Sequence, residues 1–347
     1  MKSISTRPRG RTTIGDVAAR AEVSQATVSR VLNGVENVQE EYRRRVLEAI
    51  KELDYEPNRL ASNLRRSRVA MLGVVVSDIE NPHFTVAVRA VEDAAFARGY
   101  RVLVCNTDES AEKQREYLKL LAAERVAGVI LTPSEAAAPE VTELLDLGMA
   151  VVAFDRAVTD PRADLVAAKN AEGVEAAVAH LAELGHRSIG LVAGPPNITS
   201  GDERRDGYLR GLATRGLEPA IADGGFRIDG GRRAVGELLD AHPELTAMIF
   251  ANNLMTLGGL HGLSARGVQV PADLSVIGVD DPFWAALVSP PLTTLGQPVR
   301  EMASCAVELL FRRIDGDVSE PERIILDLEL RSRSSCQPPR SGGIGRG

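Results

Sequence analysis

The stretch TTIGDVAARAEVSQATVSRVLNG, residues 12–34, contains two short helical patterns joined by a tight turn. Threonines precede the first pattern, and Ser24 is placed to cap the second, whose apolar residues Val28 and Leu32 recur at helical spacing. Two residues separate Ser24 from the end of the first pattern, a spacing typical of a helix-turn-helix. A third helical pattern follows, so residues 12–56 are predicted to form a small all-α domain.

The second of these helices has little apolar surface of its own. Val28, Val31 and Leu32 form its inward stripe, and the remaining side chains are polar or small. Hydroxyls and free backbone N–H groups in its first turn can meet a phosphate, and its amide and guanidinium groups can reach base edges in a major groove. A solvated helix face is the alternative interpretation of the same pattern.

Charge is divided unevenly along the chain. Residues 1–68 contain 14 Lys and Arg against 9 Asp and Glu, a net charge of +5, whereas residues 69–347 contain 27 against 39, a net charge of −12. A basic unit in front of an acidic remainder indicates that the first part binds nucleic acid, although the whole chain carries −7.

The pattern of apolar and polar residues changes at Val69. Apolar runs such as MLGVVVS, VAGVILT and LSVIGVD alternate with helical stretches up to about residue 332. Such alternation indicates parallel sheets covered on both faces, and the number of runs predicts two doubly wound lobes. Residues 57–68 are predicted to be a polar linker, and residues 333–347 a disordered tail.

Two crossovers, after Ala168 and around Gln297, set the expected lobe boundaries. The N-lobe is expected to comprise about residues 69–168 and 298–323, and the C-lobe about residues 169–297 and 324–332. Arg204 is expected to begin a helix in the C-lobe after a Gly-Pro loop.

The cysteines and the lack of long apolar runs indicate in which cell compartment the protein works. The three cysteines, Cys105, Cys305 and Cys336, are widely spaced and odd in number, which fits neither a disulfide framework nor a zinc site. The N-terminus lacks the apolar core of a signal peptide, and no run approaches the roughly 20 apolar residues that a membrane helix needs. We therefore expect a protein of the reducing cytoplasm, associated with the nucleoid, with no membrane partner.

Motifs of common enzymes are missing from the sequence. It contains no P-loop, no dinucleotide-binding glycine motif, no HExxH, no GxSxG and no CxxC, and none of its 5 histidines stands in a recognisable catalytic order. We expect no enzyme, no catalytic residue, no cofactor and no metal site. A transport binding protein, which the acidic part alone would suggest, does not fit the basic N-terminal unit.

The quoted stretch, followed by VQEEYRRRVLEAIKELDYEPNRLASNLRRSR, resembles the DNA-binding headpiece of the LacI/GalR (lactose/galactose repressor) family of transcriptional regulators. The combination of VSxxTVSRVLN with a downstream YxPNxxAxxL is highly specific. The resemblance continues through SDIENPHF, AFDR, LAELGHRSIGLVAGP, VPADLSVIGVDD and SPPLTTLGQP, and covers about residues 12–332. It implies a homodimeric repressor of carbohydrate-metabolism genes whose residues 69–332 form an effector-binding and dimerisation module like the type I periplasmic binding proteins.

The family resemblance also implies which headpiece residues touch double-stranded DNA. Gln25, Ala26 and Arg30 would discriminate bases. Phosphates would mainly be contacted by Ser24, Thr27, Ser29 and Asn33.

Residues 57–68 correspond to the family's hinge helix. By resemblance, Leu64 would wedge from the minor groove into a central C-G step, which kinks cheaply because it is a pyrimidine–purine step. Ala61 would pack against its two-fold mate, and Asn58 and Arg59 would lie near the DNA backbone. A dimer of such units implies a pseudo-palindromic operator.

An effector in the cleft between the lobes is a further implication of the resemblance, and a sugar or sugar derivative is expected. Carboxylates and a guanidinium can span vicinal hydroxyls, and aromatic rings can stack on the C–H face of a sugar. The matching positions are Asp78, Phe84, Asp155, Arg204, Phe226, Asn252 and Asp280.

Three positions depart from the family pattern. Asn253 stands where an aspartate commonly follows the asparagine, Lys169 stands in an expected Asp-Asn pair, and His83 replaces an aromatic or apolar residue. Lys169 suits an acidic sugar or a sugar phosphate, but a solvated lysine is the interpretation we favour, and a lone histidine is more often structural. Control by a protein partner or corepressor instead of a sugar inducer is the alternative function.

Overall fold

The computed structural model describes residues 13–32, 38–53 and 69–340, in two compact units whose boundary in the sequence lies between Arg68 and Val69. Each unit has its own hydrophobic core. None of the helices in the described residues is long and apolar enough to cross a membrane.

The N-terminal unit contains the helices α1 (Ile14–Ala21), α2 (Gln25–Leu32) and α3 (Glu40–Glu52). Thr13 and Asp16 form a capping box at the start of α1, because the Thr13 N–H donates to the Asp16 carboxylate at 2.8 Å and the Asp16 N–H donates to Thr13 Oγ1 at 3.3 Å. Ser24 caps α2 in a similar way, since its Oγ accepts a hydrogen bond from the Thr27 N–H at 3.1 Å.

The core of this unit is small and joins all three helices. Buried side chains from α1, α2 and α3 meet in one cluster, namely Val17, Ala18, Ala21, Val28, Val31, Val46 and Ala49. Two ion pairs at the surface also connect α3 to α1 and to the residue after it, with Arg20 to Glu52 at 2.5 Å and Arg45 to Glu22 at 2.7 Å. The predicted helix-turn-helix is confirmed.

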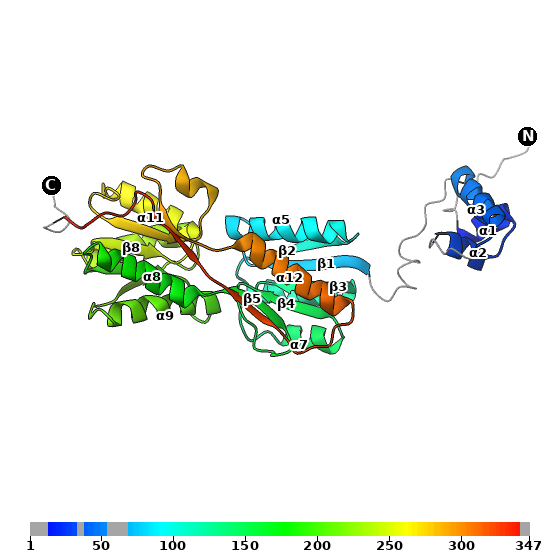
Figure 1. The fold of residues 1–347 in the computed structure, drawn as a ribbon, viewed down its shortest axis with the longest axis horizontal. Helices are drawn as coiled ribbons and strands as arrows, with labels where there is room; N and C mark the ends of the chain where they lie inside the picture. The colour runs from blue at the N-terminus through cyan, green and yellow to red at the C-terminus, as the bar shows by residue number, and fades with distance from the viewer. Residues whose placement is uncertain (1–12, 33–37, 54–68, 341–347) are drawn as a thin grey trace, which may run out of the picture. The chain divides into compact units, whose positions relative to one another are not determined.

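The second unit contains two lobes, each built on a 6-stranded sheet (Figure 1). The N-lobe sheet has the order β11-β5-β4-β3-β1-β2, and all of its strand pairs are parallel. Its strands are β1 (Val69–Val76), β2 (Arg101–Asn106), β3 (Val126–Leu131), β4 (Ala150–Phe154), β5 (Asp164–Ala168) and β11 (Arg323–Leu326). Its helices are α5 (Pro82–Ala97), α6 (Ala111–Ala123), α7 (Pro139–Asp146) and α12 (Val299–Ile314).

The C-lobe repeats this design. Its sheet has the order β12-β10-β9-β8-β6-β7, and only the β10–β12 pair is antiparallel. The strands are β6 (Ile189–Ala193), β7 (Ala220–Asp223), β8 (Ala247–Phe250), β9 (Ser275–Val279), β10 (Thr293–Gly296) and β12 (Glu329–Arg331). The helices are α8 (Asn170–Glu183), α9 (Thr199–Ala213), α10 (Ile228–Ala241), α11 (Asn253–Ala265) and the 3-10 helix η1 (Phe283–Ala286).

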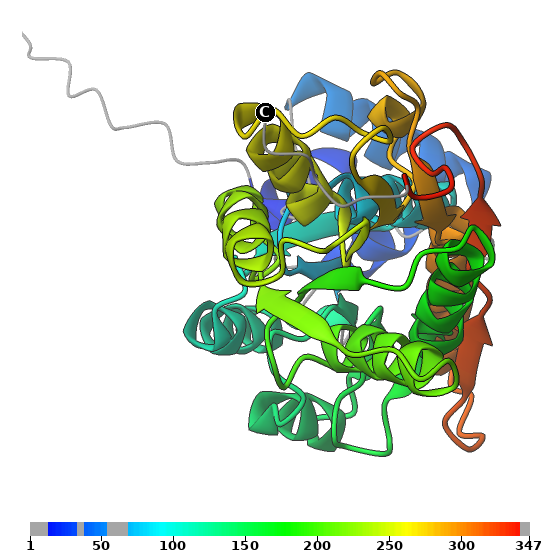
Figure 2. The same cartoon turned by 90° about the vertical axis from the view of Figure 1, so that its left-hand side faces the viewer.

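Helices cover both faces of each sheet, which explains why the central strands are apolar throughout. In the N-lobe, α5 and α12 bury Val91 and Phe311 against one face, and α6 and α7 bury Leu121 and Leu144 against the other. In the C-lobe, α8 and α9 lie opposite α10 and α11 (Figure 2). The predicted fold class of two doubly wound lobes is confirmed.

Helices α10 and α11 approach each other so closely that the contact needs glycine. A Cβ on Gly258 would lie 1.8 Å from the carbonyl oxygen of Ile228. This close contact fixes the N-terminal ends of the two helices beside each other, and both ends carry residues of the site described below.

Three sequence-based boundaries were wrong. Strand β11 pairs in parallel with β5, so residues 324–326 belong to the N-lobe, and the third crossover lies at Asp327 and Leu328 instead of after residue 323. Helix α9 begins at Thr199, so Arg204 lies within the helix and not at its start.

The tail is the third correction, because residues 333–340 pack on the C-lobe instead of being disordered; residues 341–347 lie outside the described residues. Ser335 is 0% exposed. Its carbonyl oxygen accepts a hydrogen bond from the Val276 N–H at 2.9 Å, and its Oγ accepts one from the Thr293 N–H at 2.8 Å. Hydrogen bonds to strands far away in the sequence therefore order a segment whose composition is typical of disorder.

A chain that ends at Ser332 is expected to be less stable than the full chain. The truncation leaves buried backbone groups of β9 and β10 without partners, at roughly 1–3 kcal/mol each, so thermal unfolding should shift down by roughly 5 °C or more. Differential scanning calorimetry measures the shift, with a chain ending at Arg340 as the control. Equal melting temperatures for the two truncated chains would contradict the packing described here.

Candidate functional site

Helix α2 presents a row of exposed side chains on the N-terminal unit. Gln25, Ala26 and Arg30 are exposed, whereas Val28 and Val31 face the core. Arg30 has no acidic partner among the described residues, while Arg20 and Arg45 are held in ion pairs. Among the described residues, Arg30 is therefore exposed and not engaged by an acidic group.

Part of the predicted DNA-binding set lies outside what the structure describes. Ser24 and Thr27 lie together at the start of α2, with their hydroxyl oxygens 2.9 Å apart. Ser29 belongs to α2, but its side chain is outside the description. The other predicted positions outside the described residues are Asn33, Asn58, Arg59, Ala61 and Leu64.

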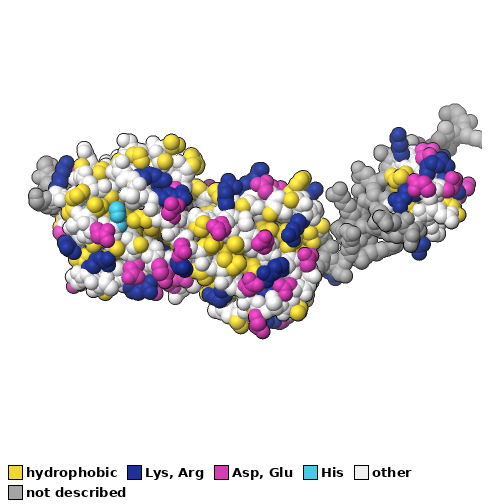
Figure 3. All heavy atoms as spheres, viewed as in Figure 1, with side chains coloured by type: hydrophobic (Ala, Val, Ile, Leu, Met, Phe, Trp, Pro, Cys, Tyr) yellow, Lys and Arg dark blue, Asp and Glu magenta, His cyan; other side chains and the backbone are white. Residues whose placement is uncertain are grey.

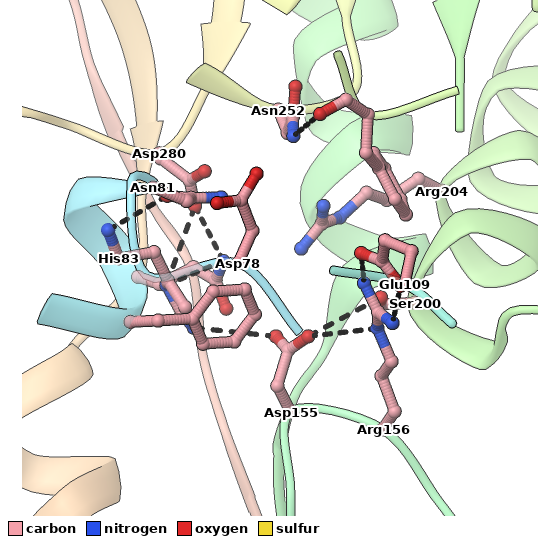
Figure 4. A pocket seen from close by; sticks show the side chains of 13 residues that line it. Asp78, Asn81, His83, Glu109, Asp155, Arg156, Ser200, Arg204, Asn252 and Asp280 are labelled. Atoms are coloured by element: carbon pink, nitrogen blue, oxygen red, sulfur yellow. Dashed lines mark hydrogen bonds and ion pairs between the residues drawn. The ribbon is translucent and has the colours of Figure 1, made fainter. Parts of the chain in front are cut away.

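In the second unit, a pocket lies between the lobes at the carboxyl ends of their strands (Figure 4), which is where doubly wound sheets bind ligands. Its side chains leave a cavity of about 20 Å³ between them. All seven predicted ligand-binding residues line it: Asp78, Phe84, Asp155, Arg204, Phe226, Asn252 and Asp280. Six further residues complete the lining: Asn81, His83, Glu109, Arg156, Ser200 and Gln297.

Four of the lining residues have left-handed backbone conformations. Glu109 has φ 57°, Asp155 has φ 66°, Phe226 has φ 57° and Asp280 has φ 74°. These values cost energy for residues other than glycine and are concentrated at functional sites. Asp155 directly follows β4 and Asp280 directly follows β9, so equivalent strand ends in the two lobes deliver a carboxylate to the same pocket.

Asp280 is held by side-chain amides from several elements. Gln297 Nε2 donates to Asp280 Oδ1 at 2.6 Å, and Asn253 Nδ2 donates to Asp280 Oδ2 at 2.8 Å. The same Asn253 nitrogen donates to Asn81 Oδ1, across the lobes, at 2.8 Å. Asn253, one of the departures from the family pattern, thus links Asp280 to the N-lobe.

Asp155 has much looser partners. Its carboxylate oxygens lie 3.5 Å from Ser200 Oγ, 3.6 Å from His83 Nε2 and 3.6 Å from Arg156 Nε. The His83 and Arg156 nitrogens are buried and have no hydrogen-bond partner among the described residues. A buried carboxylate, an imidazole nitrogen and a guanidinium nitrogen therefore converge in the pocket without a short contact between them (Figure 4).

Arg204 is anchored on the C-lobe side of the pocket. Its Nε donates to Asn170 Oδ1 at 2.8 Å and its Nη1 donates to the Ala251 carbonyl at 2.7 Å. Asn170 in turn donates to Glu203 at 2.9 Å, and burial raises the pKa of that carboxyl group. These contacts hold the guanidinium so that it points toward the centre of the pocket (Figure 4).

Arg156 and Glu109 form a buried ion pair that the sequence analysis did not assign to the site. Arg156 Nη1 and Nη2 donate to the two Glu109 oxygens at 2.6 and 2.7 Å, and the Arg156 side chain is 3% exposed. Arg156 directly follows the predicted Asp155 in the AFDR motif, so its position could have been inferred from the sequence. Nothing in the local pattern around Glu109 indicates its partner 47 residues away.

The departures at positions 169 and 83 have different outcomes. Lys169 does not line the pocket, and its amino group pairs with Asp327 at 2.7 Å at the crossover between the lobes. His83 does line it, with Nδ1 3.7 Å from Asp280 and Nε2 toward Asp155. His83 therefore belongs to the lining of the pocket, and its ring also packs against Phe84.

A second set of cross-lobe contacts closes the outer side of the pocket. Arg227, at the start of α10, pairs with Asp78 at 3.2 Å and with Asp108 at 2.6 Å. The hydrogen bond from Arg227 lowers the pKa of Asp108. Among the described residues, no group of three or more His, Cys, Asp or Glu side chains could hold a metal ion.

A helix-turn-helix unit with an exposed polar helix, followed by two lobes around a polar pocket, defines the class of ligand-responsive transcriptional regulators. The family described as "Bacterial regulatory proteins, lacI family" matches residues 13–58, and the "Periplasmic binding protein-like domain" matches residues 178–336. Similar proteins include the ribose operon repressor of Halalkalibacterium halodurans, 36% identical over 94% of this chain and 97% of that protein. The transcriptional repressor PurR of Aliivibrio fischeri is 34% identical over 93% and 98%.

Solved structures show the same similarity. The Lac repressor dimer bound to operator and the anti-inducer ONPF is 28% identical, with a TM-score of 0.82, over 94% of this chain and 99% of that one. The CelR–cellobiose complex is 34% identical, with a TM-score of 0.71, over 94% and 100%. A regulator from Enterococcus faecium with bound ribose is 28% identical, with a TM-score of 0.72, over 78% and 100%. The chain belongs to the lacI family of bacterial regulatory proteins and is a DNA-binding transcriptional regulator.

Replacing Arg30 is expected to weaken specific DNA binding. Arg30→Ala removes an exposed guanidinium with no acidic partner among the described residues, and the loss of one base contact of this kind costs roughly tenfold or more in affinity. Gel shifts on a fragment selected from random DNA by the protein itself measure the change. Arg44→Ala is the matched control, because Arg44 is an exposed arginine of α3 held by Glu48 at 3.1 Å. Equal losses for the two variants would contradict a specific role for Arg30.

Proposed function

We propose that this regulator is a homodimeric repressor of carbohydrate-metabolism genes, and that a neutral monosaccharide in the interlobe pocket sets its affinity for a pseudo-palindromic operator. The proposal includes the predicted DNA contacts of α2 and of the hinge residues Asn58, Arg59, Ala61 and Leu64. We also propose that the pocket has no catalytic role. The regulator is proposed to act in the cytoplasm, at the nucleoid, where its operator DNA lies.

The observation that carries the effector proposal is the set of unpaired polar groups around Asp155. Its carboxylate accepts hydrogen bonds, while His83 Nε2 and Arg156 Nε lack partners among the described residues and lie 3.6 Å from it. Buried polar groups without partners are rare in folded proteins and call for a ligand or water to satisfy them. A sugar hydroxyl suits this place because it both donates and accepts.

The charge of the lining favours a neutral effector. Four carboxylates line the pocket against two guanidinium groups, Arg156 and Arg204, and one carboxylate is already neutralised by Arg156. Lys169, which suggested an acidic sugar or a sugar phosphate, pairs with Asp327 instead. An anionic ligand would therefore meet an excess of negative charge in a site of low dielectric constant.

The aromatic lining of the pocket suits a sugar ring. Phe84 and Phe226 supply this aromatic surface. A relative is named ribose operon repressor, and a similar structure has ribose bound, so D-ribose is the first effector to test.

An exposed apolar surface on the C-lobe supports the proposed dimer. Phe283 is 79% exposed and Leu287 is 76% exposed, in the segment that follows β9. Figure 3 shows hydrophobic side chains along the upper edge of this lobe. Clusters of exposed apolar side chains commonly mark interfaces, and a two-fold dimer would match a palindromic operator.

Replacing Asp155 by asparagine tests the effector proposal. Asp155→Asn is expected to weaken D-ribose binding roughly tenfold to a hundredfold, because a hydrogen bond to a charged group is lost, while the melting temperature changes little since Asp155 has only long contacts. Isothermal titration measures both proteins, with Asp160→Asn as the control outside the pocket lining. D-Xylulose and cellobiose, which are bound in similar structures, are titrated beside ribose.

Either of two outcomes would contradict this prediction. One is that no monosaccharide binds the unmodified protein, which would favour control by a protein partner or corepressor. The other is that Asp155→Asn binds the sugar as tightly as the unmodified chain does.

Replacing Leu64 tests the proposed hinge contact. Leu64→Ala is expected to weaken specific operator binding sharply and to leave the dimer folded, because a leucine wedge stabilises a kinked base step. Gel shift and sedimentation measure the two properties, with Leu60→Ala as a control in the same segment. If Leu64→Ala bound the operator as tightly as the unmodified chain, the proposed contact of Leu64 with the operator would be wrong.

A further inference from the structure

The effector pocket is separated from two larger surface hollows by two different walls. One hollow, lined by Glu80, Gly225 and Asp229 among others, has a volume of about 540 Å³ and shares Asp78 with the pocket. The other, on the side of Phe283, has a volume of about 440 Å³ and shares His83, Asp280 and Gln297 with the pocket. Both hollows adjoin the pocket, so a ligand that enters from either hollow passes the corresponding wall.

The wall on the side of Phe283 is buried and well packed. The His83 and Asp280 side chains are 3% and 8% exposed, and Gln297 donates to Asp280 at 2.6 Å. The His83 ring lies edge-on against Phe84, with ring centroids 4.9 Å apart. Moving these groups would expose buried carboxylate and aromatic surface, which makes this wall costly to open.

The wall on the side of Asp78 consists of two contacts of Arg227, one to the half-exposed Asp108 and one to Asp78, whose side chain is 10% exposed. The side chains of Arg227 and Asp108 are 41% and 48% exposed, and Arg227 reaches Asp108 at 2.6 Å and Asp78 at 3.2 Å. Ion pairs that are open to water are weak and are screened by salt. A flexible arginine side chain can therefore open and close this wall at little cost.

The same wall is connected to the inside of the pocket through neighbouring residues. Glu109, next to Asp108, holds Arg156, and the Arg156 guanidinium lies 5.5 Å from the ring centre of Phe226, next to Arg227. Asp108 and Glu109 both have left-handed backbones, with φ 56° and 57°. The Asp108 side chain contacts Arg227, and the Glu109 side chain contacts Arg156 in the pocket. A ligand that contacts Arg156 and Phe226 is thus connected to both partners of the wall. Arg156 is held by Glu109, the neighbour of Asp108, and Phe226 is the neighbour of Arg227.

We propose that Arg227 is the gate of the effector pocket: a ligand enters from the hollow beside Glu80 and Asp229 when Arg227 releases Asp78 and Asp108, and is retained when these pairs form again. The gate also limits the size of the effector. A sugar longer than one ring would extend past Asp78 into the hollow and would hold Arg227 away from both aspartates. The inference rests on the proposed effector pocket.

Arg227→Ala tests the gate against Arg266→Ala. Arg266 is a matched control because its side chain is 42% exposed and its two hydrogen bonds to Asp240, at 2.7 and 3.0 Å, stay within the C-lobe. In the sugar-free protein, hydrogen exchange should be faster over residues 104–112 and 222–230 in Arg227→Ala alone. With D-ribose, stopped-flow association and dissociation rates should rise about threefold to tenfold in Arg227→Ala alone.

Salt and ligand length provide two further readouts. Raising KCl should bring the ribose rates of the unmodified protein toward those of Arg227→Ala. Cellobiose should gain affinity relative to ribose in Arg227→Ala and not in Arg266→Ala.

The outcomes separate the gate from the pocket. Equal exchange in Arg227→Ala, Arg266→Ala and the unmodified chain would overturn the gate, whether or not any sugar binds. Faster exchange in Arg227→Ala without ribose binding by any of the three proteins would support the gate and would remove ribose from the proposed function. Faster exchange with unchanged ribose rates would overturn the role of Arg227 in ligand access.

Discussion

A buried imidazole between two carboxylates is the contact on which the rest of the pocket depends. His83 of the N-lobe lies 3.6 Å from Asp155 of the same lobe and 3.7 Å from Asp280 of the C-lobe. Burying a carboxylate costs free energy unless hydrogen bonds compensate for it. The two carboxylates differ in the hydrogen bonds that they accept. Amides from Asn253 and Gln297 satisfy Asp280, whereas Asp155 has only contacts of 3.5 Å or more. The C-lobe carboxylate is therefore fixed in place, and the N-lobe carboxylate remains ready to accept hydrogen bonds from a ligand.

The architecture makes this contact sensitive to movement of the lobes. Each lobe is a rigid doubly wound sheet with its own core, and the chain crosses between them three times, after β5, β10 and β11. Closure therefore changes the distances between groups of different lobes, such as His83 to Asp280 and Asn81 to Asn253, and leaves each core intact. In the proposed mechanism, the same movement alters the spacing of the hinge segments in a dimer. Thermodynamic linkage then requires that operator and effector change each other's affinity by the same factor.

Much of the site could be predicted from the sequence, because strand ends are readable and parallel strands bring their carboxyl ends together. Asp155 and Asp280 follow apolar runs, and both line the pocket. Long-range pairing could not be read in this way. Arg227 is separated from Asp78 by 149 residues, and Ser335 from Val276 by 59 residues, so no local pattern marks either contact. The prediction of a disordered tail from composition was wrong for residues 333–340 for the same reason, because distant strands form hydrogen bonds with these polar residues.

The measurement that tests the account most directly is an operator titration at increasing D-ribose, followed by fluorescence anisotropy of a labelled operator fragment. The account predicts that saturating sugar changes the operator Kd by a factor of roughly 5 to 150, and that operator DNA changes the sugar Kd by the same factor. An operator Kd that stays constant while the sugar occupies the pocket would contradict it.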